Sequence, residues 1–401
     1  MERQILHVDV NNAFLSWTAV ERLKNGESLD IRTIPAIIGG DEAQRKGIVL
    51  AKSNLAKQVG IQTGEPIYFA RKKCPDLKIY QSNFSVYRKY SNQLYNLLLE
   101  YTDRIERFSI DECFLDMTQF IPKGKNLLQI AYEISRRVKE ELGFTVNVGV
   151  AHNKLLAKMA SDFEKPDKVH TLFENEISTK MWNLPVAELF MVGRRSLPKF
   201  QKMGIKTIKD LAQKDEAQMV KVFGKYGKMI WEYANGIDNS EVNFEEEKPK
   251  GIGNSITLPY DYADIEKLEE VLVALVEQVA YRLRCHKMLA EVVNVQIKTN
   301  EFKVYSHQRK LMMPTDNTKI ILDEAKKLLH ELYDKTPIRL IGVRIDKLCE
   351  SKELQLSLFD NTSNKQTKID KVVDELKQKY GYDKITRAGK MNLDKSIKFK
   401  E

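Results

Sequence analysis

Two adjacent acids lie inside an apolar stretch of the sequence, in the segment RFSIDECFLD at residues 107–116. Phe108 and Ile110 alternate with a serine before the acids, and apolar residues continue after Asp111 and Glu112. This pattern predicts a strand and its hairpin partner with two carboxylates at the bend. Because a carboxylate is costly to bury unless something pairs with it, both acids are candidates for binding a cation.

A third acid, Asp9, lies near the end of the strand predicted by QILHVDV at residues 4–10. Folding of one sheet could bring it beside Asp111 and Glu112. Three carboxylates at neighbouring strand ends form the hard oxygen site that Mg²⁺ prefers. Two Mg²⁺ ions about 3.5–4 Å apart can stabilise both the attacking and the leaving oxygen of a phosphoryl transfer. The alternative is that Asp111 and Glu112 are ordinary polar turn residues.

The surrounding elements predict a sheet with helices packed on it. A helix follows Asp9 and closes at Gly26, and the helical patterns at residues 84–102 and 125–142 have an apolar face. The segment FTVNVGVAH at residues 144–152 alternates as a strand. We therefore expect three strands, with the acids at strand ends or at a hairpin turn.

Two later segments have the pattern of a helix, a glycine turn and a second helix, at residues 181–200 and 215–235. In helix-hairpin-helix units the amides of the turn can bind a phosphate of the DNA backbone. A plain helical hairpin is the alternative. Basic residues beside the turns favour nucleic acid, namely Arg194, Arg195, Lys225 and Lys228.

After a charged linker, the pattern of residues 251–350 is β-α-β-β-α-β. Such a sheet has one face open to solvent, and we expect Lys298 and Lys303 to lie on it as part of a DNA-binding surface. A polar outer face is also ordinary for a half-buried sheet.

The polar tail after this unit contains QLSLFD at residues 355–360, with a helix expected at 368–380. Exposed apolar side chains of this kind usually bind a partner. The alternative is a short edge that folds back on the last domain.

The bulk composition agrees with a folded, nucleic-acid-binding protein. The chain has 401 residues, which indicates two to four domains, and 42% of its residues are hydrophobic. A formal net charge of +9 favours a polyanionic partner, although a soluble protein of high pI is the alternative. The four cysteines are far apart, which argues against a disulfide framework or a zinc site. No signal peptide or membrane span is evident, so we expect a cytoplasmic protein.

Five segments occur in an order that resembles the Y-family of translesion DNA polymerases, the family of DNA polymerase IV and of the polymerase V catalytic subunit. The resemblance covers nearly the whole chain. Its segments are HVDVNNAF at 7–14, SNLAK at 53–57, SIDECFLD at 109–116, VGVAHNKLLAKMASDFEKP at 148–166 and QLSLF at 355–359.

The resemblance implies an α/β (α+β) multidomain fold of the right-hand polymerase type. It assigns a palm to residues 1–19 and 76–167, small fingers to 20–75, a helix-hairpin-helix thumb to 168–240, a linker to 241–250, a β-α-β-β-α-β little finger to 251–350 and a tail with a clamp-binding motif to 351–401.

The resemblance also implies the catalytic residues. Asp9, Asp111 and Glu112 match the metal-binding acids, and the carbonyl of Val10 is a further expected ligand for two Mg²⁺ ions. Phe14 matches the steric gate, an aromatic ring below the sugar that would clash with a 2′-hydroxyl.

Further matching positions concern the nucleotide and the clamp. Lys165 matches a triphosphate-binding lysine, and Asn54 and Lys57 stand where many members carry tyrosine and arginine. Lysine offers phosphate a point charge, whereas arginine binds it through two parallel hydrogen bonds. Asn11 stands where many relatives carry a second aspartate. The motif expected to dock on a ring-shaped sliding clamp comprises Gln355, Leu356, Leu358 and Phe359.

The predicted function is a template-directed, error-prone translesion DNA polymerase without proofreading, which extends a primer 3′-hydroxyl with dNTPs during DNA damage tolerance and repair. The expected partners are primer–template DNA, dNTPs and a sliding clamp; we expect a monomer and no membrane association. Two alternatives stay open. One is a nucleotide cyclase or terminal transferase with the same sheet, and the other is a catalytically inactive DNA-binding accessory protein.

Overall fold

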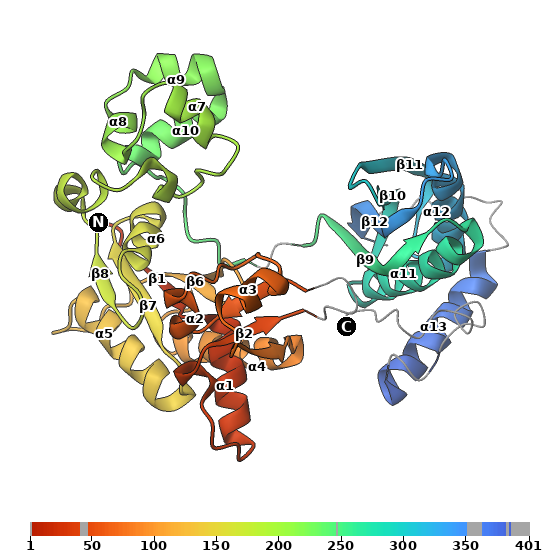
Figure 1. Ribbon diagram of the computed structural model, residues 1–401, viewed down its shortest axis with the longest axis horizontal. Helices are drawn as coiled ribbons and strands as arrows, with labels where there is room; N and C mark the ends of the chain where they lie inside the picture. Colours follow the sequence, from red (N-terminus) through yellow and green to blue (C-terminus); the bar gives the residue numbers. More distant parts are fainter. Residues whose placement is uncertain (1, 41–46, 246–247, 351–362, 382–384, 386–401) are drawn as a thin grey trace. The chain divides into compact units, whose positions relative to one another are not determined.

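A computed structural model describes residues 2–40, 47–245, 248–350, 363–381 and 385. The chain divides into two compact units, one formed by the chain up to Gly40 with Ile48–Glu246 and the other by the chain from Glu247 onward. The multidomain mixture of helices and sheets that the sequence predicts is confirmed (Figure 1). No helix among the described ranges combines the length and apolar character needed to cross a membrane.

The first unit is built on a five-stranded sheet of order β5-β6-β1-β7-β8. β1 pairs antiparallel with both β6 and β7, which places Asp9 opposite Glu112 on one side and opposite Asn147 on the other. The sequence predicts only three of these strands. The five are β1 (Ile5–Val10), β5 (Ile105–Arg107), β6 (Glu112–Asp116), β7 (Val146–Ala151) and β8 (Val169–Thr171).

The side chains of β1 alternate between two packed faces. Leu6, Val8 and Val10 enter one hydrophobic core, whose helices are α1 (Ala13–Lys24), α4 (Phe84–Leu98) and α5 (Leu127–Arg137). His7 and Asp9 point to the other face, where α6 (Lys154–Asp162) packs on the sheet. Every polar group of β1 is therefore directed towards α6.

Gly149 lets α6 approach β7 closely. A Cβ atom at this position would lie 1.9 Å from the carbonyl oxygen of Ala157 and 2.7 Å from the amide nitrogen of Ser161. Both neighbours are helix backbone, so neither can move aside without shifting α6. The missing side chain of Gly149 thus determines how closely α6 packs on the sheet.

We expect Gly149→Ala to destabilise the first unit by roughly 3 kcal/mol, the upper range for overpacking a core. Urea unfolding followed by circular dichroism would measure the change. Gly193→Ala is the matched control, because a Cβ there meets no atom within 4 Å. Equal unfolding midpoints for the two variants would contradict the close packing of α6 on β7.

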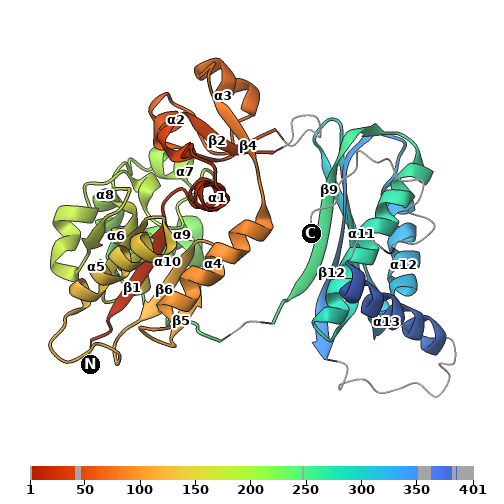
Figure 2. The same ribbon diagram turned by 90° about the horizontal axis from the view of Figure 1, so that it is seen from below.

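A small three-stranded sheet follows α1 in the chain, with the order β3-β2-β4. β2 pairs antiparallel with β3 and parallel with β4. Figure 2 shows this sheet and its helices projecting beyond α1. Its elements are η1 (Ile31–Thr33), β2 (Ala36–Gly39), β3 (Val49–Lys52), α2 (Asn54–Gln58), α3 (Ile67–Lys73) and β4 (Lys78–Gln81).

The remaining part of the first unit is helical and only partly follows the predicted pattern. At 181–200 the sequence predicts a helix on each side of a glycine turn, but the first of these is only a short 3₁₀ turn, η6 (Val186–Glu188). Pro185 immediately before η6 lacks an N–H donor and disfavours helical backbone in Leu184, which explains the difference. The other elements are η3 (Val138–Leu142), η4 (Glu174–Glu176), η5 (Ile177–Met181), α7 (Leu197–Lys202) and α8 (Ile208–Ala212).

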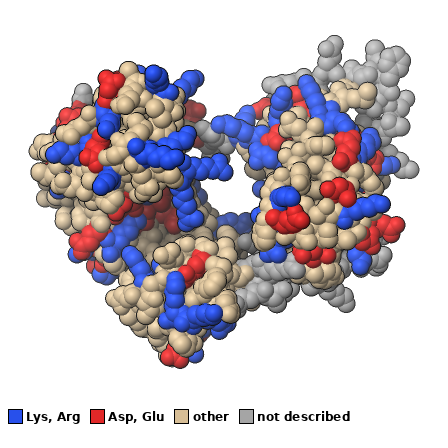
Figure 3. Space-filling view, turned by 45° about the horizontal axis from the view of Figure 1, so that its top comes forward, with Lys and Arg blue, Asp and Glu red and all other residues tan. Residues whose placement is uncertain are grey.

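The second predicted helical hairpin is present. α9 (Glu216–Phe223) and α10 (Lys225–Ala234) meet at Gly224, whose φ of 64° is in the region that favours glycine. Exposed basic side chains surround the α7 and α9–α10 region, and Figure 3 shows Lys and Arg on the surface of both units. The exposed residues here are Arg194, Arg195, Lys199, Lys202, Lys221, Lys225 and Lys228.

The second unit has the predicted β-α-β-β-α-β order. Its sheet runs β11-β10-β12-β9, and α11 and α12 pack on the strands. Lys298 is half-buried and Lys303 is exposed. The elements are β9 (Gly251–Tyr262), α11 (Ile265–Cys285), β10 (Met288–Thr299), β11 (Val304–Thr315), α12 (Thr318–Leu332) and β12 (Ile338–Glu350).

A further helix, α13 (Ser363–Tyr380), docks on this unit through acidic side chains. The carboxylate of Asp370 accepts a hydrogen bond from the Thr318 amide at 3.0 Å, at the start of α12. Asp374 accepts from the Arg284 guanidinium at 3.0 Å. The predicted helix at 368–380 is thus part of a longer one, whereas the predicted clamp motif at 355–359 lies outside the described residues.

Candidate active site

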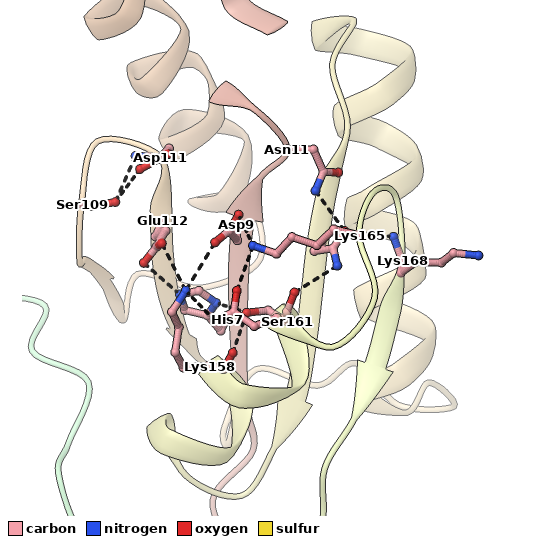
Figure 4. Close-up of polar contacts among 12 residues, drawn as sticks. His7, Asp9, Asn11, Ser109, Asp111, Glu112, Lys158, Ser161, Lys165 and Lys168 are labelled. Carbon is pink, nitrogen blue, oxygen red and sulfur yellow. Dashed lines mark hydrogen bonds and ion pairs between the residues drawn. The ribbon is translucent and has the colours of Figure 1, made fainter. Parts of the chain in front are cut away.

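Two of the three acids predicted from the sequence, Asp9 and Glu112, face each other at one end of the β1–β6 pair, whereas the Asp111 side chain is turned to Ser109 (Figure 4). Asp9 and Glu112 are directly opposite in the antiparallel register. The carbonyl of Asp111 accepts a hydrogen bond from the Val10 amide at 3.0 Å, which fixes the hairpin turn to β1. The carboxylate of Asp111, in contrast, accepts from Ser109 Oγ at 2.7 Å.

A lysine of α6 bridges the two facing acids. Lys158 Nζ lies 3.4 Å from Asp9 Oδ2 and 3.1 Å from Glu112 Oε1. Its side chain is only 10% exposed, so water screens this charge poorly. Lys158 is not among the site residues predicted from the sequence, where it has the pattern of an ordinary helical lysine. Its spacing from Asp162 and Lys165, at intervals of four and three residues, is the only sequence signal that groups it with them.

Lys165 approaches Asp9 from the loop after α6. Its Nζ is 3.1 Å from Asp9 Oδ1 and 2.9 Å from Asp162 Oδ1. The structure therefore brings this predicted nucleotide-binding lysine directly to the predicted catalytic acids. Two ammonium groups, from Lys158 and Lys165, thus contact three carboxylates, from Asp9, Glu112 and Asp162, so this cluster has a formal charge of −1.

The two facing acids have different pKa values, because burial dominates for Asp9 and the neighbouring groups dominate for Glu112. Burial raises the pKa of Asp9 to about 6, although Lys165 and Lys158 oppose the change. Burial also acts to raise the pKa of Glu112, but His7 and Lys158 outweigh it and hold that pKa at about 2. Asp9 is the more deeply buried of the two and benefits most from a cation placed against it.

His7 lies beside the two facing acids and contacts both Glu112 and Ser161. It is fully buried, and burial lowers its pKa to about 4, so the ring is neutral at pH 7. Ser161 Oγ donates to the carbonyl of Lys158 at 2.8 Å and lies 2.8 Å from His7 Nδ1. The other ring nitrogen, Nε2, faces Glu112 Oε2 at 3.6 Å, and this is the contact through which His7 lowers the pKa of Glu112. Residues two positions apart in a strand lie on the same face, so the sequence alone could have placed His7 beside Asp9.

The donor set of this site fits a divalent cation. Its carboxylates are hard oxygen ligands of the kind that Mg²⁺ prefers, and a cationic group, the Lys158 ammonium, already lies between Asp9 and Glu112. In the arrangement described here, Lys158 and Ser109 occupy oxygens of these acids. Accordingly, the described residues contain no ready-made group of three metal-ligating side chains.

Phe14 lies in the first turn of α1, one loop away from Asp9. Its half-buried ring stacks on Tyr87 of α4 at a centroid distance of 4.3 Å, with an angle of 7° between the rings. Phe84 meets it edge-on at 5.8 Å. The predicted steric-gate residue is thus held rigidly by an aromatic cluster.

Asn54 and Lys57 lie in the short helix α2, which is capped by Ser53. Asn54 Oδ1 accepts a hydrogen bond from Asn12 Nδ2 at 3.3 Å. This contact links the small sheet to the loop between β1 and α1. Lys57 is exposed. The structure therefore places Asn54 next to the loop that follows Val10, while Lys57 faces solvent.

A sheet that pairs Asp9 with Glu112, followed by the basic α9–α10 hairpin and an open split-βαβ sheet, is the arrangement expected of a nucleotidyltransferase of the right-hand type. Comparison with known proteins identifies the family. Family models match residues 8–162 (impB/mucB/samB family), 188–238 (thumb domain of DNA polymerase iota) and 249–358 (C-terminal domain of the impB/mucB/samB family).

Curated relatives extend this match over the whole chain. DNA polymerase IV of Clostridium acetobutylicum is 48% identical over 97% of this chain and 98% of its own length. DNA polymerase IV of Acetivibrio thermocellus is 37% identical over 97% of each chain. A solved chimera of the Y-family polymerases Dbh and Dpo4 is 25% identical, with a TM-score of 0.76 over 86% of this chain and 99% of that one.

The chain belongs to the Y-family of DNA polymerases, as the resemblance implies. Its relatives carry the name DNA polymerase IV. Members of this family depend on divalent metal ions and act on primer–template DNA with dNTPs. The prediction of a DNA polymerase, rather than an inactive accessory protein, is confirmed at the level of the family.

Proposed function

We propose that this chain is a template-directed translesion DNA polymerase that transfers a dNMP from a dNTP to a primer 3′-hydroxyl and releases pyrophosphate. The observation that carries the proposal is the pairing of Asp9 with Glu112 across β1 and β6, with Lys165 in contact with Asp9. This arrangement offers carboxylates for metal ions beside a cation for the triphosphate.

Asp9, Asp111, Glu112 and the carbonyl of Val10 would hold two Mg²⁺ ions. Bound there, the ions would lower the proton affinity of the 3′-hydroxyl and offset charge on the triphosphate. Lys165 would then exchange its contact with Asp9 for a triphosphate oxygen. Phe14 would hold the sugar and exclude a 2′-hydroxyl, while Asn54 and Lys57 would lie on the fingers side of the nucleotide.

The proposed domains are those that the family resemblance implies: a palm at 1–19 and 76–167, fingers at 20–75, a thumb at 168–240, a linker at 241–250, a little finger at 251–350 and a tail with a clamp-binding motif at 351–401. The basic side chains of the thumb would contact DNA phosphates, and binding should weaken steeply with salt. The chain would act as a monomer in the cytoplasm.

Primer extension on a template with one abasic site tests the translesion part of the proposal. We expect full-length product past the lesion at a reduced rate, and no removal of a mismatched 3′ nucleotide. A stop one nucleotide before the lesion on every template tested, with normal extension elsewhere, would contradict translesion activity.

The proposed clamp motif gives a separate prediction. Replacing Leu358 and Phe359 by alanine should remove apolar anchors worth about 2 kcal/mol or more each, so that a sliding clamp no longer lengthens the products. Extension without the clamp should be unchanged, because neither residue belongs to the palm. Gel analysis of product length with and without the clamp measures both effects, and clamp stimulation of the double variant equal to wild type would refute the assignment.

A further inference from the structure

Lys165 has no regular element to hold it. It lies between the end of α6 and the start of β8, and its ammonium contacts Asp9 and Asp162. A lysine side chain is flexible and does not fix the position of its own ammonium. The range that the ammonium of Lys165 can reach therefore depends on where the backbone of this loop lies. The groups that hold the residues on either side of Lys165 thus decide where its ammonium can lie.

Asn147 of β7 makes hydrogen bonds to three residues that flank Lys165, one near the end of α6 and two in the loop. Its Nδ2 donates to the carbonyl of Ser161 at 3.0 Å and to the carbonyl of Glu164 at 2.7 Å. Its Oδ1 accepts from the amide of Lys168 at 3.3 Å. These contacts bracket Lys165 on both sides, and Asn147 is 0% exposed, so water cannot replace them.

Asn11, at the end of β1, completes the network. Its Nδ2 donates to Asn147 Oδ1 at 3.0 Å. Its Oδ1 accepts from the amide of Asp167 at 2.9 Å and from Thr145 Oγ1 at 2.9 Å. The side-chain nitrogen and oxygen of both asparagines thus have hydrogen-bond partners within the protein. The arrangement needs a donor and an acceptor on each side chain, which an amide supplies.

We infer that Asn11 and Asn147 are positioning residues that set the place of Lys165 at the triphosphate end of the active site, an inference that rests on the proposed role of Lys165. Apart from the bond between them, they make five hydrogen bonds, four of which go to the backbone at 161, 164, 167 and 168. An aspartate at 147 could not replace the amide, because its oxygens would face the carbonyls of Ser161 and Glu164.

A double-mutant cycle tests the inference. Single-nucleotide incorporation is measured for wild type, Asn147→Ala, Lys165→Ala and the double variant, with kcat and the KM for dNTP determined separately. We expect Lys165→Ala to raise KM roughly tenfold, the usual effect of losing a hydrogen bond to a charged group, and Asn147→Ala to raise it by up to the same factor because it acts through Lys165. The double variant should be no worse than Lys165→Ala alone, and the Kd for primer–template DNA should not change.

Two further variants separate positioning from general damage to the fold. Asn11→Ala leaves the Asn147 bonds to the carbonyls of Ser161 and Glu164 in place, and is the milder probe if Asn147→Ala does not fold. Asn153→Ala is the matched control: Asn153 caps the start of α6 and donates to the Gly236 carbonyl at 2.9 Å. It should lower the melting temperature but leave the KM for dNTP within twofold of wild type.

The possible failures are distinguishable. If Lys165→Ala raises KM but the two effects multiply in the double variant, Asn147 acts independently of Lys165 and the inference is overturned. If Asn153→Ala raises KM as much as Asn147→Ala, the effect is general and the inference is equally overturned. If Lys165→Ala leaves KM unchanged, the proposed role of Lys165 fails and the inference falls with it.

Discussion

Asp9→Asn should reduce the rate of primer extension by about 10³-fold or more while the protein stays folded, the scale of loss expected when a group that stabilises transition-state charge is removed. Asparagine keeps the size of the side chain but removes the charge that would hold a divalent cation. Because Asp9 is only 6% exposed and its charge is costly there, the neutral amide should not lower the unfolding temperature much.

Single-turnover extension in Mg²⁺, with circular dichroism as the check on folding, measures this effect. Glu112→Gln should behave in the same way, and EDTA should abolish wild-type activity until Mg²⁺ is restored. Asp116→Asn is the matched control: it changes an acid on the same strand, whose Oδ1 accepts from Thr118 instead of facing the site. A folded Asp9→Asn variant with wild-type rates would contradict the assignment.

The second large effect concerns the sugar of the nucleotide. Phe14→Ala should lower discrimination against ribonucleotides by roughly 10²-fold, since removal of a close steric contact is worth about 1–3 kcal/mol. The ring is well placed to act as a rigid barrier, because Tyr87 and Phe84 fix it from two directions. Alanine would open space where a 2′-hydroxyl is otherwise excluded.

The ratio of kcat/KM for a dNTP and the matching rNTP measures this discrimination. Tyr87→Phe is a suitable control, because it keeps the ring on which Phe14 stacks and removes only the hydroxyl. The steric-gate role would have to be abandoned if Phe14→Ala incorporated ribonucleotides no better than wild type while using dNTPs normally.

Much of the catalytic sheet is predictable because periodicity in the sequence reports burial directly. The alternation in HVDV predicts β1, and the apolar run after the two acids predicts β6. Asp9 and Glu112 were selected by residue type, and the register that places them opposite each other agrees with that choice. The order β-α-β-β-α-β of the second unit was likewise visible in its pattern.

Other features depend on contacts between distant segments, which periodicity does not report. Lys158 has the pattern of an ordinary helical lysine, and only the packing of α6 on β1 turns it inward against two carboxylates. Asn11 and Asn147 pair across neighbouring strands that are far apart in the sequence. β5 and β8 have only three residues each, too short to give a strand signal. The missing helix before Gly193 reflects Pro185, whose local effect outweighs the helical pattern.

The most direct test of the account is primer extension by the purified full-length chain with Mg²⁺ and one dNTP at a time, on four primer–templates that differ only in the first template base. We predict that each template accepts mainly its complementary dNTP and that the Asp111→Ala, Glu112→Ala double variant extends none of them.

Nucleotide addition that ignores the template base would contradict a template-directed polymerase and favour a terminal transferase. The absence of addition on all four templates, by a folded protein that binds the DNA, would contradict the catalytic role assigned to the acids of this site.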